Sequence, residues 1–537
     1  MFRKYLILFI IFVFITGVLS GCNNSDVLLA EQQILRYNLG TEPETLDSAK
    51  AKGNIEFNVL INLFEGLIRL DATGNPQPAA AESWDIEDNG KKYIFHLRDT
   101  KWSNGDPVTA YDFEYSWKRV LNPDTASGYA YQLFYIKNAA AYNSRDSNTS
   151  SDTVGVKALD EKTLEVTLEA PTAYFLTLLA SPVYYPVHKP TVEEQGDKYG
   201  AQAEGFVSNG PFKIVSWRHQ EKIELAKNEN YWDSEQVKLS RLVFLMIDNP
   251  STELAAFETG QIEFGDNPPY PEIERLKQQN KAKIASDFSN YFFMFNVKKP
   301  PLNDPRVRKA LNLAIDRKAL VENVLKAGQV PALAFVPYGL KDLKGEDFRA
   351  TGADYFKDAD FEKARELLSE AGYPDGKGFP EIQILTNNNG NNKPIAEAVQ
   401  QMWSKNLNIK VKIKVQEWMV YLESLFTGDY QTSGIMWSPD YLDPMTFLDI
   451  FVTGGGNNVT FWGNKDYDNL IETAKKTSDL EKRFELMHDA EEILMEEMPV
   501  SPIFFNADPY MLKPYVKDVI LNPMGWRDFK NCWIEKH

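Results

Sequence analysis

The chain has 537 residues, of which 43% are hydrophobic and 25% charged, a composition that is ordinary for a folded soluble protein. This length exceeds what a single hydrophobic core usually serves, so we expect two or more lobes. The formal net charge of −18 repels nucleic acid and anionic lipid headgroups, which excludes both as expected direct partners.

The N-terminal segment has the layout of a lipoprotein signal peptide. A short positive region precedes a nearly unbroken apolar run over residues 5–19, and Leu-Ser-Gly-Cys then ends at Cys22. The run is short for a membrane-spanning helix. Because Leu-Ser-Gly-Cys fits the bacterial lipobox, we expect residues 1–21 to be removed, acyl chains on Cys22 to bind the membrane and residues 22–29 to act as a tether. The alternative is an ordinary signal peptide or an uncleaved anchor with an incidental cysteine.

Strands and helices are predicted along the rest of the chain. Alternating apolar and polar residues predict strands over residues 93–97, 222–226, 242–246 and 410–415. Asp304 and Pro305 form the cap and first turn of a helix. Ser478 to Glu481 fits a capping box before a second helix. Since strands and helices are interspersed, the fold class is α/β or α+β.

Residues that carry catalysis or bind metals are sparse. The five histidines are scattered, and none stands at metal-ligand spacing from another histidine or a cysteine. No His-Glu-x-x-His helix and no Gly-x-Ser-x-Gly elbow occurs. Cys22 and Cys532 cannot supply a disulfide framework, and we expect Cys532 to be a buried structural thiol. We therefore expect no catalytic residues, no metal and no cofactor.

Specific sequence blocks recur in order from about residue 34 to the end. They include Lys-Trp-Ser-Asn-Gly-Asp-Pro-Val-Thr-Ala at 101–110 and Trp-Ser-Pro-Asp-Tyr-Leu-Asp-Pro at 437–444. The other blocks lie at residues 40–47, 63–67, 81–84, 95–98, 112–119, 208–212, 227–232 and 303–310. With these blocks the chain resembles the bacterial extracellular solute-binding proteins of the peptide and nickel group, and within it the oligopeptide-binding proteins.

The resemblance implies a bilobal α/β fold of the periplasmic-binding-protein-like kind, type II and of the large peptide-binding class, with an extra domain. On that pattern residues 30–53, 186–288 and 505–537 form lobe I. Residues 54–185 form the additional domain and residues 289–504 form lobe II. A cleft between the lobes would close around the ligand, and this closure requires contacts from both lobes.

The function implied by the resemblance is the capture of extracellular oligopeptides and their delivery to the membrane subunits of an ABC permease. The protein is expected to be a monomer and not an enzyme. It would be held through Cys22 on the outer face of a Gram-positive membrane, or on the periplasmic side in a Gram-negative cell.

A site that accepts many peptides should bind their main chain and charged ends, because these do not vary with sequence. A hydrogen bond to a charged group contributes about 1.5–3 kcal/mol, against about 0.5–1.5 kcal/mol for a neutral one. The terminal ammonium is therefore the strongest single contact. In the family, the aspartate of a Trp-x-x-Asp-Tyr element receives it, and here this residue is Asp440. The alternative for Asp440 is a turn residue.

The resemblance also implies two pairing segments and two aromatic residues around the peptide. The first segment comprises Gly434, Ile435, Met436, Trp437 and Ser438, and the second comprises Thr41, Glu42, Pro43 and Glu44. Trp437 and Trp418 match aromatic positions of the pocket, although either could be plain core. Pro43 cannot donate a hydrogen bond, which weakens the second segment. Tyr441 and Asp443 are expected to be structural.

One position departs from family members that take fixed, very short peptides. Those members carry a basic residue three positions before this tryptophan, where it meets the ligand carboxylate, and here Gly434 occupies the position. Longer or variable peptides are therefore favoured over a fixed carboxylate clamp.

Other functions stay open. A binder of another solute, such as a nickel complex or a sugar, and a peptide-pheromone receptor would have the same fold. The few histidines argue against bare metal, and Asp440 favours a ligand with an amine. An adhesin and an enzyme with an unrecognised catalytic set are the alternatives from other classes.

Overall fold

The computed structural model describes residues 32–285, 287–341, 345–387, 392–477 and 479–536. The expected signal peptide, lipidated cysteine and tether lie outside the described residues. Within these ranges, no helix is both long enough and apolar enough to cross a membrane.

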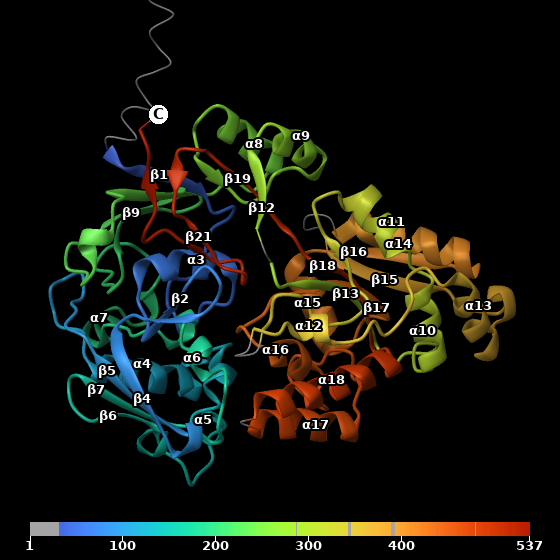
Figure 1. Ribbon diagram of the computed structural model, residues 1–537, viewed down its shortest axis with the longest axis horizontal. Coiled ribbons are helices and arrows are strands. Elements are labelled where there is room, and N and C mark those ends of the chain that lie inside the picture. Colours follow the sequence, from blue (N-terminus) through green and yellow to red (C-terminus); the bar gives the residue numbers. More distant parts are fainter. Residues whose placement is uncertain (1–31, 286, 342–344, 388–391, 478, 537) are drawn as a thin grey trace, which may run out of the picture.

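A seven-stranded sheet forms the centre of one lobe (Figure 1). Its strand order is β12-β19-β11-β1-β10-β9-β8. The strands are β1 (Ile34–Asn38), β8 (Phe212–Arg218), β9 (Lys222–Lys227), β10 (Arg241–Leu245), β11 (Phe264–Gly265), β12 (Ala282–Ala285) and β19 (Asp508–Leu512). β1 lies parallel to β10 and β11, while β9 pairs antiparallel with both β8 and β10. The sheet therefore unites segments from the beginning, middle and end of the chain.

A six-stranded sheet forms the centre of the other lobe, in the order β14-β18-β13-β17-β15-β16. The strands are β13 (Asn290–Phe295), β14 (Val330–Pro331), β15 (Ile382–Asn387), β16 (Val411–Gln416), β17 (Thr432–Trp437) and β18 (Val500–Phe505). The helices of this part of the chain are α10 (Pro305–Leu313), α11 (Arg317–Ala319), α12 (Phe348–Thr351), α13 (Phe361–Glu370), α14 (Asn392–Leu407), α15 (Trp418–Thr427), α16 (Met445–Leu448), α17 (Lys465–Lys476) and α18 (Leu480–Glu497).

A four-stranded antiparallel sheet, β4-β5-β7-β6, lies below the seven-stranded sheet in Figure 1. Its strands are β4 (Ala81–Glu87), β5 (Lys92–Leu97), β6 (Val156–Ala158) and β7 (Thr163–Thr167). The nearby helices are α3 (Asn54–Leu63), α4 (Ala110–Leu121), α5 (Ala139–Asn143), α6 (Phe175–Leu178) and α7 (Lys189–Gln195), and α8 (Pro250–Glu258) and α9 (Ile273–Gln278) belong to the seven-stranded lobe. Three two-stranded ladders pair β2 (Ile68–Leu70) with β3 (Pro76–Pro78), β20 (Val516–Lys517) with β23 (Trp533–Ile534), and β21 (Ile520–Leu521) with β22 (Arg527–Asp528).

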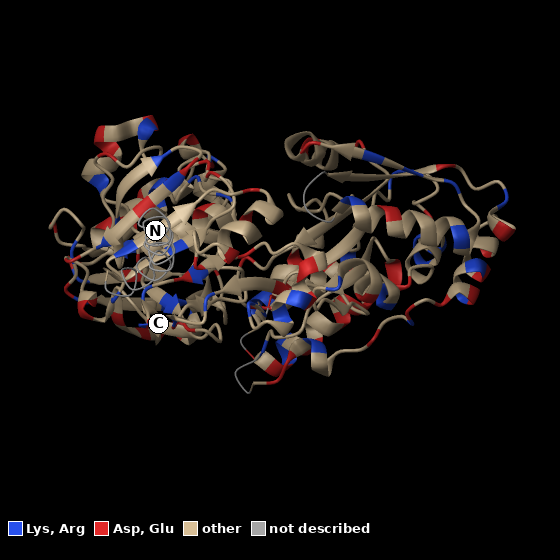
Figure 2. Ribbon diagram, turned by 90° about the horizontal axis from the view of Figure 1, so that it is seen from above, with Lys and Arg blue, Asp and Glu red and all other residues tan. Residues whose placement is uncertain are grey.

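The chain crosses between the two large sheets after β12 and again after β18. The two crossings are bonded to each other. The Asn506 backbone N–H donates to the Ser289 carbonyl at 2.9 Å, and Asn506 Nδ2 donates to Asp287 Oδ2 at 2.6 Å. Acidic and basic residues are interspersed along the ribbon of both lobes in Figure 2.

The predicted elements are present, with shifts of one residue at some ends. The strands predicted over 93–97 and 222–226 lie within β5 and β9, whereas β10 and β16 are displaced by one residue from 242–246 and 410–415. α10 begins at Pro305, and Asp304 caps it by accepting from the Arg306 N–H at 2.9 Å. Ser478, the first residue of the predicted capping box, lies outside the described residues. Asp479 caps α18 by accepting from the Lys482 N–H at 3.1 Å.

Candidate functional site

Asp440 lies in the turn that follows β17, where Thr446 holds the backbone. The Asp440 N–H donates to Thr446 Oγ1 at 3.0 Å, and Trp437 Nε1 donates to the Thr446 carbonyl at 3.0 Å. Both Asp440 and Trp437 are half-buried. The turn is therefore fixed by its main chain and by the Trp437 indole, which leaves the Asp440 carboxylate available for other contacts.

The Asp440 carboxylate meets a tyrosine from a distant part of the chain. Tyr131 Oη donates to Asp440 Oδ2 at 2.6 Å, and Tyr129 stacks on Tyr131 with ring centroids 5.7 Å apart. Among the described residues no cation forms an ion pair with Asp440. Burial raises the pKa of Asp440 to about 7, although the hydrogen bond from Tyr131 opposes the shift. In the part of the chain that the structure describes, Asp440 is thus a carboxylate without a counterion, beside two aromatic rings.

The next residues of the motif are structural, as expected. Asp443 accepts two hydrogen bonds from the Arg483 guanidinium, at 2.6 and 2.7 Å, and both side chains are buried. Tyr441 stacks on Tyr174 with centroids 4.8 Å apart and planes 9° from parallel. The Arg483 guanidinium also lies 4.8 Å from the Tyr174 ring centroid. These contacts join α16 and α18 to the part of the chain that carries the four-stranded sheet.

β17 presents one edge that is partly unpaired. β13 pairs with it from Thr432 to Trp437, but β15 pairs with it only at Thr432 and Ser433. On the β15 side, no described strand bonds to the stretch from Gly434 to Trp437. Ile435 is half-buried, Met436 is 40% exposed and Ser438 is exposed. This edge can therefore accept an added extended chain.

Gly434 is a position that admits no side chain as the structure stands. A Cβ there would lie 2.3 Å from Tyr291 Oη, and Tyr421 Oη donates to the Gly434 carbonyl at 2.9 Å. Tyr291 is fully buried. The sequence has no basic residue at position 434, and the packing around it leaves no room for one.

Exposed apolar side chains lie on β16, α15 and β17. The Trp418 ring stacks on Tyr421 at 5.6 Å, and Trp418 is 37% exposed, which favours a pocket aromatic over plain core. The other large apolar side chains exposed in this segment are Val415, Met419, Val420, Phe426 and Met436. Because monomeric proteins seldom gather exposed apolar groups without a use, this surface is a candidate for ligand contact.

The segment from Thr41 to Glu44 forms no strand here, and its contacts are with β8 and α3. The Glu42 carboxylate accepts from Trp217 Nε1 at 2.7 Å, and the Glu44 N–H donates to Glu56 Oε1 at 2.8 Å. Pro43 is buried and Thr41 is exposed. The expected pairing of this segment with a peptide stays a prediction.

Two further expectations concern cysteine and metals. Cys532 is fully buried and unpaired, and burial raises the pKa of its thiol, so the prediction of a buried structural thiol is confirmed. In the ranges that the structure describes, no three His, Cys, Asp or Glu side chains are placed to hold a metal ion.

Comparisons with known proteins agree with this architecture. The family model of bacterial extracellular solute-binding proteins, family 5 Middle, matches residues 75–459. The oligopeptide-binding protein OppA of Bacillus subtilis is 39% identical, with 93% of this chain and 92% of that protein covered. The dipeptide-binding protein DppE of the same organism is 37% identical, covering 94% and 92%.

A solved structure extends the likeness to three dimensions. Haemophilus influenzae OppA in complex with RPPGFSPFR is 33% identical and superposes with a TM-score of 0.81 over 94% of this chain and 99% of that one. The expected bilobal α/β fold is therefore confirmed. The chain belongs to the bacterial extracellular solute-binding proteins, family 5, as its sequence motifs predicted.

Proposed function

We propose that this protein captures extracellular oligopeptides at Asp440 and delivers them to the membrane subunits of an ABC permease. The observation that carries the proposal is the half-buried carboxylate of Asp440, which has no counterion among the described residues and lies directly beyond a strand edge that β15 pairs with only in part. Such a carboxylate suits a terminal ammonium, and such an edge suits a peptide main chain. The peptide-binding relatives support the same ligand class.

In this proposal the ammonium binds the Asp440 carboxylate beside Tyr129 and Tyr131. The rings add a favourable interaction, since a cation is attracted to an aromatic face. The peptide main chain then pairs with the stretch from Gly434 to Ser438, and its side chains meet the exposed apolar surface. Thr41, Glu42, Pro43 and Glu44 approach from the other side when the lobes close. Because packing at Gly434 leaves no room for a basic side chain that would hold the carboxylate of a short peptide, the site favours longer or variable peptides.

We also propose the division of the chain and its location. Lobe I comprises 30–53, 186–288 and 505–537, the additional domain 54–185 and lobe II 289–504, a division supported by the membership of the three sheets. The protein acts outside the cytoplasm as a monomer, with acyl chains on Cys22, and has no enzymatic activity. It needs no nucleic acid, metal or cofactor.

Native mass spectrometry of protein purified without denaturation tests the peptide proposal. We expect the bound species to form a ladder of peptide masses. A site that binds the peptide main chain and terminal ammonium retains peptides of many different sequences. Protein carrying Asp440→Asn, purified in parallel, should lose most of this ladder. A single bound compound without an amine, retained equally by both proteins, would contradict the proposal.

The affinity for peptides should depend on pH in a bell-shaped manner. Because the pKa of Asp440 is about 7 without ligand, its carboxyl must release a proton to bind an ammonium at lower pH. Affinity should therefore fall below about pH 7, by up to about tenfold per pH unit. It should fall again above about pH 8, where the peptide amine, with a pKa of about 7.7–8.0, loses its proton. Calorimetry with one peptide from the bound ladder checks this.

We attribute the acid side of this profile to Asp440. With Asp440→Asn the loss of affinity at low pH should disappear while the loss at high pH persists. A profile with the same acid limb in both proteins would show that another group titrates.

A further inference from the structure

Two methionines differ from all others that the structure describes, because their side chains are exposed to solvent. Met419 is 61% exposed and Met436 is 40% exposed. Met246 and Met402 are half-buried, and every other described methionine is buried. A reagent dissolved in the surrounding water therefore reaches Met419 and Met436 before the other methionines in the described ranges.

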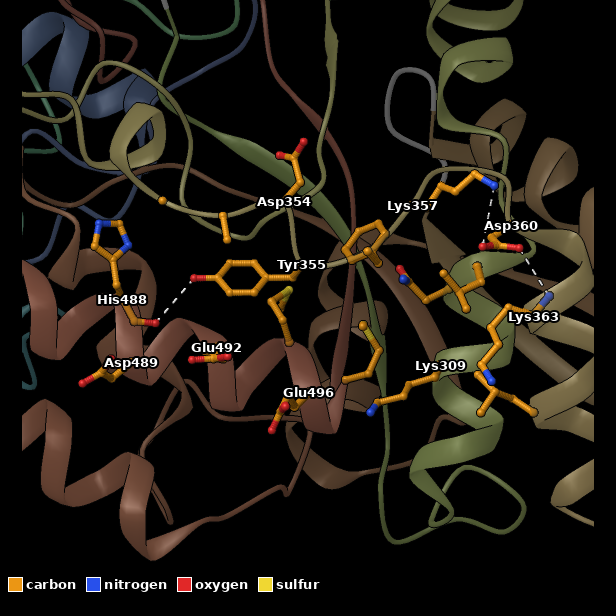
Figure 3. A pocket seen from close by; sticks show the side chains of 18 of the residues that line it. Lys309, Asp354, Tyr355, Lys357, Asp360, Lys363, His488, Asp489, Glu492 and Glu496 are labelled. Atoms are coloured by element: carbon orange, nitrogen blue, oxygen red, sulfur yellow. Dashed lines mark hydrogen bonds and ion pairs between the residues drawn. The ribbon is translucent and has the colours of Figure 1, made fainter.

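Other sulfur-containing side chains are shielded, even where they line a pocket. A pocket of about 840 Å³ lies among α10, α12, α13 and α18 (Figure 3), and Met495 and Met498 belong to its lining. Each of these two side chains is nevertheless only 3% exposed. Cys532 is fully buried, and burial raises the pKa of its thiol, which keeps the reactive thiolate from forming. These buried side chains provide internal references for the two exposed ones.

Both exposed methionines belong to elements that carry residues of the proposed peptide site. Met436 lies in β17, in the stretch that β15 does not pair with. Met419 lies in α15, and Tyr421 of the same helix donates from its hydroxyl to the Gly434 carbonyl of β17 at 2.9 Å. The Cβ atoms of opposite residues in paired antiparallel strands are about 4.5–5.5 Å apart. A peptide added to this edge of β17 would therefore stand beside Met436.

The sulfur atom of Met436 lies beside one of the two crossings between the lobes. Asn506, which directly follows β18, places its Nδ2 atom 3.7 Å from Met436 Sδ. The same nitrogen donates to Asp287 Oδ2, in the other crossing, at 2.6 Å. Since an amide nitrogen carries two hydrogens, at most one remains for a new acceptor on Met436. An oxygen atom added to this sulfur would depend on water for its other hydrogen bonds.

Hydrogen peroxide supplies such an oxygen atom to an accessible methionine. The thioether sulfur attacks one oxygen of the peroxide, the O–O bond breaks, and an S–O bond forms. The sulfur is oxidised by two electrons, and the other peroxide oxygen leaves with both hydrogens as water. The product is a polar sulfoxide in place of a flexible apolar side chain.

We propose that Met436 is an oxidation site through which peroxide lowers the affinity for peptides, an inference that rests on the proposed function. The sulfoxide oxygen is hydrated in the free protein, and a peptide on β17 covers it. Burying a polar group that loses hydrogen bonds to water is unfavourable, so affinity falls. Methionine sulfoxide reductases return the sulfoxide to the thioether and restore binding. Met419 is oxidised as well, but it lies outside the pairing strand and has the smaller effect.

Peroxide treatment of the whole protein, followed by removal of the peroxide with catalase, tests this site. Peptide mapping by mass spectrometry should show Met419 and Met436 gaining an oxygen atom at least about tenfold faster than Met495 and Met498. A bound peptide should slow the oxidation of Met436 more than that of Met419. Calorimetry with a peptide that contains no methionine should then show a Kd raised by about tenfold, which treatment with the reductases reverses.

Two variants assign the effect, and each is compared with itself before peroxide. In Met436→Leu the Kd should rise by less than about twofold on oxidation, whereas Met419→Leu should keep the rise of about tenfold. Equal oxidation rates at exposed and buried methionines, an unchanged Kd of the oxidised protein, or the full rise in Met436→Leu would each overturn this inference alone. Failure of the untreated protein to bind peptides would overturn the proposed function, and this inference with it.

Discussion

Asp440→Asn should weaken the binding of peptides with a free amino terminus by about 30- to 150-fold. Removing one partner of a buried, hydrogen-bonded charge pair costs about 2–5 kcal/mol, and the half-buried position of Asp440 places the loss at the lower end of that range. Asparagine has the same shape and can still accept from Tyr131 Oη, so the change removes the charge and little else. Calorimetry with peptides of defined sequence measures the effect.

Acetylated peptides provide the control for this change. Acetylation removes the ammonium, so it should weaken binding to the natural protein about as much as Asp440→Asn does and add little in the variant. Unfolding by denaturant should show the same stability for both proteins. Unchanged affinity, or additive losses from acetylation and the substitution, would rule out the carboxylate–ammonium contact.

Arg483→Met should lower the free energy of unfolding by about 3–5 kcal/mol. The substitution removes the two hydrogen bonds that the guanidinium donates to the buried carboxylate of Asp443, and an uncompensated buried charge is far costlier than a lost surface pair. The contact of the guanidinium with the Tyr174 ring is lost as well. Chemical denaturation followed by tryptophan fluorescence measures the change.

The preceding residue offers a matched control. Lys482 is exposed and pairs with Glu485 at 2.9 Å, so Lys482→Met should cost no more than about 1 kcal/mol. The double variant Arg483→Met, Asp443→Leu should recover part of the loss, because it removes the orphaned charge. Equal effects of Arg483→Met and Lys482→Met would contradict the structural role of the buried pair.

The predicted strands and helices are present in the structure because the spacing of apolar residues indicates which face of each element is buried. The sequence indicates the ends of these elements less clearly. β16 covers residues 411–416 because each of them pairs with one residue of β15, a register that the alternation alone does not contain. At α18, adjacent Ser478 and Asp479 are both good caps, and the sequence does not decide between them.

The candidate site could be predicted only where a motif marked it. Asp440 and Trp437 were proposed from the Trp-x-x-Asp-Tyr element, but the contact with Tyr131 was missed, because Tyr131 reaches Asp440 from more than 300 residues away. No local pattern distinguishes Tyr131 from the other tyrosines. The partners of Glu42 and Glu44 are likewise set by tertiary packing, since Trp217 and Glu56 come from other elements.

The hydroxyl of Tyr131 has a consequence for how cargo is exchanged. If a peptide ammonium binds Asp440 as proposed, it meets a carboxylate that already accepts a hydrogen bond from Tyr131 at one of its two oxygens. The gain from the new contact is then smaller than it would be for a carboxylate with no hydrogen bond of its own. When the ligand leaves, the Tyr131 hydroxyl still donates to the carboxyl group, which lowers the cost of emptying the site.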